Sequence, residues 1–441
     1  MRMLIAVWIT KILILAGKFA GKKGSSTPGI FAMKIFPDIL KFLAKQVKND
    51  IIVVCGTNGK TTTNNLLNTI IKSAGKNVVC NNVGANMLPG VVTAFIEKTN
   101  LLGKLDADYG CIEIDEISTV KVFPYFEPDY MIITNLFRDQ LDRYGEIETT
   151  MNYMQKALDM CKNTKLILNA DDPLVASFGK KTGKECYYFG VGEDAGISLN
   201  ETKEGRFCMF CNDELKYDFY HYSQLGMYRC DKCGFKRPEV DFEAKNVNLN
   251  TGISFSVNEQ NFNVKYRGFY NIYNILAAYS AITLCGLKAD NINDILCDYK
   301  PQTGRMEEFN IKGKQVVFNL AKNPAGFNQA ISTVLGDKRK KNIITVINDN
   351  AGDGKDVSWL WDVDFERFNN INANKFYVSG IRRDDVAVRF KYAEIVDFEC
   401  SDNVKDAILK ALDEECDVLY ILVNYTALFS THDILKSLEE K

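Results

Sequence analysis

Histidine is scarce in this sequence, and the scarcity limits the chemistry available to it. Only two of the 441 residues are histidine, His221 and His432. A glutaminase built on a cysteine nucleophile needs a histidine base and an acid that orients this base. Neither histidine begins a His-x-Glu pair, because Ser223 and Ile434 stand two residues further on. We therefore expect that the chain does not hydrolyse glutamine by itself.

A large net charge and a long apolar run are also absent. The formal net charge is −2, which gives no general attraction to nucleic acid. Residues 3–16 are apolar apart from Thr10 and Lys11, and this run is too short to span a bilayer. Residues 17–23, which follow it, match the small-residue cleavage site of a secretory signal poorly. Together with thirteen cysteines, this indicates a reducing, cytoplasmic compartment in which thiols pack or bind metals.

Residues 1–48 form a basic segment with nine Lys or Arg residues and a single acid, Asp38. Its apolar part fits an amphipathic helix on a membrane surface, which would make the protein peripheral at the inner face of the cytoplasmic membrane. A helix packed on the globular body fits equally well. The sequence leaves both interpretations open.

Residues 51–63 carry the clearest functional pattern. The apolar run 51–55 predicts a buried parallel strand, and the glycines that follow allow a tight turn whose N–H groups face an anion. Lys60 supplies a positive charge for phosphates, and the hydroxyl of Thr61 is a Mg²⁺ ligand at the start of a helix. Val54 replaces the first glycine of the strict P-loop spacing. The expected ATP-binding residues are Gly56, Thr57, Asn58, Gly59, Lys60, Thr61 and Thr62.

Residues 49–302 alternate predicted strands and helices, which indicates a doubly wound parallel sheet in an α/β ATP-binding domain. In such sheets, ligands bind at the carboxyl ends of the strands. Three polar segments fall at these ends: Glu113 ends one strand, and Asn135 and residues 169–173 follow two others. Acids that face a phosphate loop suggest Mg²⁺ ligation, with Glu113 as the first choice. Helix caps and solvated turns are the alternative.

Residues 205–240 interrupt this alternation with two Cys-x₂-Cys pairs. Eighteen residues separate the pair Cys208 and Cys211 from the pair Cys230 and Cys233. This spacing predicts a four-thiolate zinc site in a small ribbon inserted into the ATP-binding domain. Four protein ligands leave no open position for water, so the site would be structural. His221 is a rival ligand, although we expect it at the surface.

A second, Rossmann-like α/β domain is predicted over residues 303–441. Arg305 lies on the connection between the two domains, from which domain closure would bring it to the phosphate or the substrate. Ahead of this connection, Asn271 and Asn274 share one face of a predicted helix. Their amides would either cap this helix or form hydrogen bonds with an adenine.

These segments together resemble the Mur ligase family. The resemblance covers residues 50–441 and implies an ATP-dependent carbon–nitrogen ligase. Three features depart from the family pattern. Gln140 stands where a histidine is usual, and no domain for a uridine nucleotide precedes the phosphate loop. The lysine that many members carbamylate has no convincing match, since Lys156 is the nearest and is discounted. The residues that carry the resemblance are 56–62, Glu113, Asp142, Arg143, 169–173, Asn271, Asn274 and 304–306.

The cysteine ribbon and the segments 135–143 and 349–361 also resemble one branch of this family, the ligase subunits of lipid II isoglutaminyl synthase. This resemblance implies amidation of the D-glutamate α-carboxylate of lipid II through an acyl phosphate, with ATP, Mg²⁺ and Zn²⁺. It also implies a heterodimer with a GatD-like glutaminase that supplies ammonia, and an aspartate of this chain that completes the glutaminase site. Asp349, Asp353 and Asp356 are the candidates, with helix capping or a role at the nucleotide as alternatives.

Three rival functions stay open. One is an amino-acid-adding Mur or folylpolyglutamate-type ligase, although the missing first domain argues against the former. Another is a zinc-ribbon NTPase that binds nucleic acid, which would need a basic ribbon face; residues 205–240 carry about as many acids as bases. The third is a scaffold that binds ATP without catalysis.

Overall fold

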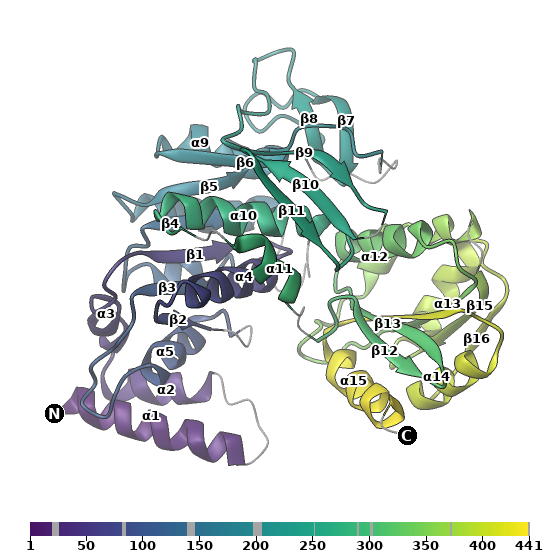
Figure 1. Cartoon of the computed structure of the whole chain (residues 1–441), viewed down its shortest axis with the longest axis horizontal. Coiled ribbons are helices and arrows are strands. Elements are labelled where there is room, and N and C mark those ends of the chain that lie inside the picture. Colours follow the sequence, from purple (N-terminus) through teal and green to yellow (C-terminus); the bar gives the residue numbers. More distant parts are fainter. Residues whose placement is uncertain are drawn as a thin grey trace.

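The computed structural model describes most of the chain as two sheets covered by helices and one small ribbon (Figure 1). This arrangement confirms the predicted α/β class. The described residues are 1–19, 26–81, 85–138, 146–196, 205–250, 252–288, 291–299, 303–370 and 373–439.

The larger sheet has nine strands in the order β11-β10-β9-β6-β5-β4-β1-β3-β2. Neighbours from β2 to β9 are parallel, whereas β9, β10 and β11 form an antiparallel meander. The chain builds β2 and β3 on one side of β1 and the later strands on the other, so a topological switch point lies beside β1. The strands are β1 (Ile51–Cys55), β2 (Val78–Cys80), β3 (Tyr109–Glu113), β4 (Tyr130–Ile133), β5 (Lys165–Asn169), β6 (Cys186–Val191), β9 (Phe242–Asn248), β10 (Ile253–Val257) and β11 (Gln260–Val264).

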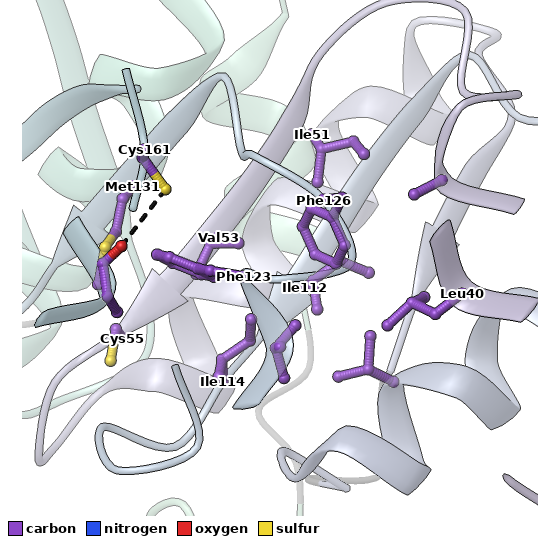
Figure 2. Close-up of a cluster of buried hydrophobic side chains, with 14 of the residues drawn as sticks. Leu40, Ile51, Val53, Cys55, Ile112, Ile114, Phe123, Phe126, Met131 and Cys161 are labelled. Carbon is purple, nitrogen blue, oxygen red and sulfur yellow. Dashed lines mark hydrogen bonds between the residues drawn. The ribbon is translucent and has the colours of Figure 1, made fainter. Parts of the chain in front are cut away.

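Strand β1 is buried on both faces of this sheet, as a continuous apolar run predicts. Ile51, Val53 and Cys55 pack into the core on one face, and Figure 2 shows Phe123 and Phe126 packed against them. Ile52 and Val54 point into the core on the opposite face. The phosphate loop therefore starts from the most enclosed strand of the sheet.

Two layers of helices cover the larger sheet. One layer packs on the face of Ile52 and consists of α4 (Lys60–Ser73), α10 (Tyr270–Leu284) and α11 (Ile292–Asp298). The other layer packs on the face of Val53 and consists of α1 (Arg2–Phe19), α2 (Thr27–Ile35), α3 (Ile39–Ala44), α5 (Leu88–Glu97), α6 (Thr119–Val122), α8 (Ile147–Asp159) and α9 (Pro173–Thr182).

The helices of the basic N-terminal segment form the outer part of this second layer. Ala6, Val7 and Thr10 of α1 are buried, and α1 lies on the outer side of α2, which in turn contacts α5 (Figure 1). Among the described residues, no helix has the length and hydropathy needed to cross a bilayer.

The smaller sheet lies in the C-terminal part of the chain. Its order is β12-β13-β17-β14-β15-β16, and all neighbours are parallel except the β12–β13 hairpin. Its strands are β12 (Glu307–Ile311), β13 (Lys314–Leu320), β14 (Lys341–Val346), β15 (Ala373–Ser379), β16 (Phe398–Cys400) and β17 (Val418–Val423). The helices around it are α12 (Pro324–Gly336), η1 (Ser358–Asp362), η2 (Phe365–Asn370), α13 (Arg383–Tyr392), α14 (Val404–Asp413) and α15 (Tyr425–Glu439).

One part of the fold expectation is wrong. The sheet expected over residues 49–302 is not parallel throughout, because β10 and β11 add an antiparallel hairpin beside β9. Asn258 and Glu259 form its two-residue turn, and both have a positive φ, 45° and 69°. Turns of this kind match the twist of paired strands and favour an antiparallel hairpin over a helical crossover.

Candidate active site

The phosphate loop lies between β1 and α4, at the carboxyl edge of the larger sheet. Gly56 and Gly59 have φ values of 117° and 85°, which only glycine adopts without strain. A Cβ atom at Gly59 would also lie 2.2 Å from Oδ1 of Asn274. The chain therefore needs glycine at both positions to bring the loop close to its neighbours.

The segment after β4 fixes the position of this loop. The carbonyl of Asn135 accepts from the N–H of Thr57 at 2.8 Å, and its side-chain Oδ1 accepts from the N–H of Asn58 at 2.8 Å. Thr134 Oγ1 donates to the carbonyl of Asn58 at 2.7 Å. The Asn135 segment is thus brought to the loop, as expected, but its contacts hold backbone.

The first turn of α4 follows the loop and presents N–H groups for which the helix has no acceptor. Thr61 and Thr62 lie there and are half-buried. The partial positive charge of a helix N-terminus and these donors together suit an anion.

Lys60 folds back over the loop and is buried. Its ammonium donates to the carbonyls of Gly56 and Thr57, and it lies 3.3 Å from Oε2 of Glu116. The side chains of Lys60 and Glu116 are only 9% and 6% exposed, so this is a buried ion pair. The lysine is therefore already held against an anion at the place where phosphates would bind.

Glu116 was not singled out from the sequence. Burial raises the pKa of Glu116, and the positive charge of Lys60 opposes this rise. The positive charge of Lys322, in the loop after β13, also lowers the pKa of Glu116. A lysine of the C-terminal part of the chain therefore lies near the Lys60–Glu116 pair. No residue pattern pointed to this contact, because it joins segments about two hundred residues apart.

Glu113 lies at the end of β3, next to β1, as predicted. Oε1 of Glu113 accepts from the side-chain amide of Asn86 at 3.1 Å, and its backbone is bonded to Asn81. Oε2 of Glu113 is buried and has no hydrogen-bond partner among the described residues. A buried carboxylate oxygen without a partner is costly unless a ligand or an ion satisfies it.

The carboxyl edges of the two sheets meet at the phosphate loop. Asn323, which follows β13 and caps α12, exchanges side-chain hydrogen bonds with Asn58 at 3.2 and 3.4 Å. A second link joins Arg138 to Asp362 at 3.2 Å. The site therefore lies between both parts of the chain.

Asn271 and Asn274 also lie beside the loop. Asn274 accepts from Thr63 of α4 at 3.4 Å and donates to Oδ1 of Asn271 at 3.0 Å. Asn271 donates to the carbonyl of Arg267 at 2.7 Å. The two amides thus tie α10 to α4, which is a structural role; contact with an adenine stays a prediction.

Arg305 is half-buried on the connection between the sheets. Its positive charge lies close enough to Tyr270 and Tyr299 to oppose the rise that burial causes in the pKa of both phenols. Arg305 therefore lies near the N-terminus of α10. No described contact joins it to Lys60 or Glu113.

The aspartates of the 169–173 segment have structural partners. Asp172 caps α9 and also accepts from the N–H of Leu136 at 2.8 Å, and burial raises its pKa to about 6. Asp171 pairs with Arg237 at 2.6 Å and accepts from the hydroxyl of Tyr273 at 2.7 Å. The sequence left open whether these aspartates cap a helix or bind Mg²⁺. Asp172 is a helix cap, and the contacts of Asp171 and Asp172 do not suggest Mg²⁺ ligation.

The structure also places His221 and Lys156, about which the sequence had made suggestions. His221 is 1% exposed and packed against Phe219 and Phe269, so the expectation of a surface histidine is wrong. Lys156 is exposed on α8. Gln140 lies outside the described residues, as do Asp142 and Arg143.

The four ribbon cysteines lie together. Their sulfur atoms are all within 4.8 Å of one another, and the pairs Cys208–Cys233 and Cys211–Cys230 are each 3.4 Å apart. Tetrahedral zinc with Zn–S bonds of about 2.3 Å places its sulfurs about 3.8 Å apart, so the cluster can hold zinc after small shifts of the thiols. His221 is not part of this group.

Two matching turns and an apolar base build this cluster. Asn212 follows the first pair and Gly234 follows the second, both with positive φ, and each donates its N–H to the carbonyl of the first cysteine of its pair. The small sheet of β7 (Lys216–Tyr222) and β8 (Leu225–Arg229) joins the two turns. Tyr228 and Phe235 pack with Ala176 of α9, which anchors the ribbon to the larger sheet.

The three C-terminal aspartates differ in their partners. Asp353 caps the first turn of α15 through Thr426, and Asp356 accepts from the N–H of Ser358 at the start of η1. Asp349 follows β14 at the carboxyl edge of the smaller sheet, with only loose contacts to Lys355 at 3.7 Å and Arg382 at 3.8 Å. Asp349 is therefore the one of the three that is not engaged in capping.

Comparisons with known proteins agree with this geometry. Residues 54–282 match the family model for the Mur ligase middle domain, and residues 320–428 match that for the MurT ligase C-terminal region. A pseudomurein peptide ligase type C from Methanothermus fervidus has the same fold, with a TM-score of 0.69 and 25% identity over 90% of this chain and 80% of that one. MurF from Thermotoga maritima, solved in complex with ADP, superposes with a TM-score of 0.61 at 17% identity over 93% of this chain and 84% of that one. The fold and the phosphate loop define a Mur-type ligase.

Curated relatives show which kind of Mur-type ligase this chain is similar to. The chain is 36% identical to the lipid II isoglutaminyl synthase (glutamine-hydrolyzing) subunit MurT of Staphylococcus aureus, over 97% of this chain and 96% of that protein. The MurT subunit of Streptococcus pneumoniae is 35% identical over 94% of this chain and 93% of its own length. The chain belongs to the Mur ligase family, in the branch of the MurT subunits.

Proposed function

We propose that this protein is the ligase subunit of a lipid II isoglutaminyl synthase, which amidates the D-glutamate α-carboxylate of lipid II. The observation that carries the proposal is a glycine-rich phosphate loop whose lysine is paired with Glu116 where the edges of the two sheets meet. Relatives that match nearly the whole chain bear the name of this activity. These relatives are not named as amino-acid-adding ligases.

The chemistry begins with a carboxylate, which is a poor electrophile. An oxygen of the substrate carboxylate attacks the γ-phosphorus of ATP, so that an acyl phosphate forms and ADP leaves. Ammonia then attacks the acyl carbon, and inorganic phosphate leaves with the electron pair of the C–O bond. Negative charge builds up on the transferring phosphoryl group, and Lys60 with the first turn of α4 is positioned to stabilise it.

Glu113 and Thr61 are the residues we assign to Mg²⁺. The buried, unpartnered Oε2 of Glu113 supports this assignment, because a carboxylate oxygen is the ligand that this cation prefers. When bound with ATP, Mg²⁺ would neutralise charge on the phosphates. Arg305, Asn271 and Asn274 are assigned to the nucleotide, and they lie around the N-terminus of α10.

Release of ADP tests this function in its simplest form. The full chain, supplied with ATP, Mg²⁺, lipid II and ammonium, should release ADP over many turnovers only when both the lipid and the ammonium are present. Release that nucleic acid stimulates would favour the zinc-ribbon NTPase. Nucleotide binding without any release would favour a scaffold.

Glu116 competes with phosphate for Lys60, and this leads to a prediction. The variant Glu116→Gln removes a negative charge next to the incoming phosphates, so ATP without Mg²⁺ should bind about tenfold more tightly, measured by calorimetry. The matched variant Glu113→Gln does not touch Lys60 and should leave this affinity unchanged while weakening the effect of added Mg²⁺. Equal affinities for the wild type and Glu116→Gln would contradict the competition.

Zinc is proposed as the occupant of the four-cysteine cluster. Elemental analysis of wild-type protein grown with zinc should find one zinc ion per chain. Cys233→Ser should lose this ion and lower the free energy of unfolding by roughly several kcal/mol, because metal binding contributes to folding directly. The control is Cys400→Ser, which changes an exposed thiol outside the cluster and should keep both the zinc ion and the stability of the wild type. Zinc-free wild-type protein would defeat the assignment.

A separate glutaminase is proposed as the source of ammonia. The relatives are named as subunits of a glutamine-hydrolysing enzyme. His221 of this chain is buried among aromatic rings, and His432 pairs with Glu307 at 3.1 Å inside its own sheet layer, so neither suits a glutaminase base. Asp349 is the residue we assign to the partner's site, because Asp353 and Asp356 are engaged as caps.

A further inference from the structure

Helix α1 is apolar around most of its circumference, but only one of its faces is covered. Ala6, Val7 and Thr10 face the protein and are buried. The opposite side carries a stripe of exposed apolar side chains with the three- and four-residue spacing of one helix face. These residues are Ile5, Trp8, Ile9, Ile12, Leu15 and Phe19.

The turn after α5 extends this stripe. Leu101 and Leu102 are 65% and 74% exposed, and the indole N–H of Trp8 donates to the carbonyl of Leu101 at 2.7 Å. We call these eight residues the α1 face. A helix that is apolar all round is normally buried, and proteins in water rarely leave such a continuous patch uncovered.

The charged side chains of helix α1 itself are all basic. Helix α1 contains no acid, and Arg2 and Lys18 are exposed at its two ends. Lys11 donates to the backbone carbonyl of Glu97 at the end of α5, and Lys18 pairs with the carboxylate of Glu97. Over residues 1–48, nine basic residues stand against the single acid Asp38. The surroundings of the apolar stripe therefore attract anions.

We propose that the α1 face docks on the surface of a bilayer that contains anionic phospholipids. An apolar helix face inserts at the level of the headgroups, a tryptophan is favoured at this depth, and the flanking lysines interact with anionic lipid. A partner protein would have to bury the apolar stripe and match these cations with acids, whereas an anionic bilayer provides both properties in one surface.

The position of α1 relates membrane docking to the candidate active site. Helix α1 packs on α2, α2 packs on α5, and α5 begins just after Asn86, whose amide contacts Glu113 of the candidate site. The α1 face is thus connected to Glu113 of the candidate site through packed helices. This use rests on the proposed function, since it places the ligase where a lipid-linked substrate resides.

Vesicle flotation tests the docking. The full chain should float with vesicles of phosphatidylcholine and phosphatidylglycerol, and less with phosphatidylcholine alone or in high salt. The double variant Ile12→Glu with Leu15→Glu should bind the anionic vesicles at least about tenfold more weakly. The control Met160→Glu with Val396→Glu places two acids at exposed apolar positions elsewhere and should bind like the wild type.

Trp8 reports the same event directly. Its fluorescence should shift to the blue on binding, and the shift should disappear in Trp8→Phe, although Trp359 and Trp361 remain. No vesicle binding by the wild type, or equal binding by the Ile12 and Leu15 variant, would overturn the proposal. So would a dimer in sedimentation that this variant dissociates, because the α1 face would then cover a second copy. Amidation assayed in detergent micelles needs no docking, so its failure would count against the proposed function alone.

Discussion

Lys60→Ala should lower the rate of lipid II amidation by at least about a thousandfold, because it removes the positive charge that stabilises the transferring phosphoryl group. The rate is measured with ammonium as the nitrogen source, so that the result reports on this chain alone. Wild-type turnover in this variant would remove the argument for the phosphate site.

The structure adds a second expectation for this variant. A phosphate-loop lysine would ordinarily be replaceable without harm to the fold, but Lys60 is buried and paired with Glu116. Its removal leaves a buried acid without its cation, which should destabilise the protein by about 1–3 kcal/mol. The double variant Lys60→Ala with Glu116→Gln removes this unpaired charge, so stability should recover while activity does not. Recovery of activity in the double variant would show that Lys60→Ala acts through folding.

Asp349→Asn should abolish amidation driven by glutamine and leave amidation driven by ammonium intact. An amide cannot stabilise the positively charged form of a partner's histidine, so glutamine hydrolysis should fall by about a hundredfold or more. The measurement compares both nitrogen sources in the reconstituted complex of the chain with its glutaminase.

Asp353→Asn and Asp356→Asn are the controls for this prediction. Both residues cap helical turns, and asparagine caps about as well as aspartate, so each variant should keep nearly all of its stability and its activity with both nitrogen sources. Full glutamine-dependent activity in Asp349→Asn would mean that this aspartate does not serve the partner. Selective loss in one of the controls would move the assignment to that residue.

Much of the fold could be predicted because the local signals are strong and agree. The apolar run before Gly56 predicted β1, and the spacing of the four cysteines predicted a cluster that the structure brings together. The β10–β11 hairpin was missed because its turn is Asn258-Glu259, without the glycine that usually marks such turns.

The site was harder to predict, since it depends on contacts between distant segments. Periodicity cannot decide which of the acids after β3 reaches Lys60, because the chain leaves the extended conformation after Glu113 and turns Glu116 inward. The pairing of Asn58 with Asn323 depends on how the two sheets meet. His221 is also covered by the rings of Phe269 and Tyr273, which come from a distant segment of the chain, so its burial depends on tertiary packing.

Mass spectrometry of lipid II tests the central claim most directly. After incubation of the full chain with ATP, Mg²⁺ and ammonium, the lipid should carry a carboxamide in place of the α-carboxylate of its D-glutamate, and fragmentation should locate the change at that residue. Omission of ATP should leave the lipid unchanged. Lipid II that keeps its carboxylate under the complete conditions, or that gains an amino acid instead, would contradict the proposed function.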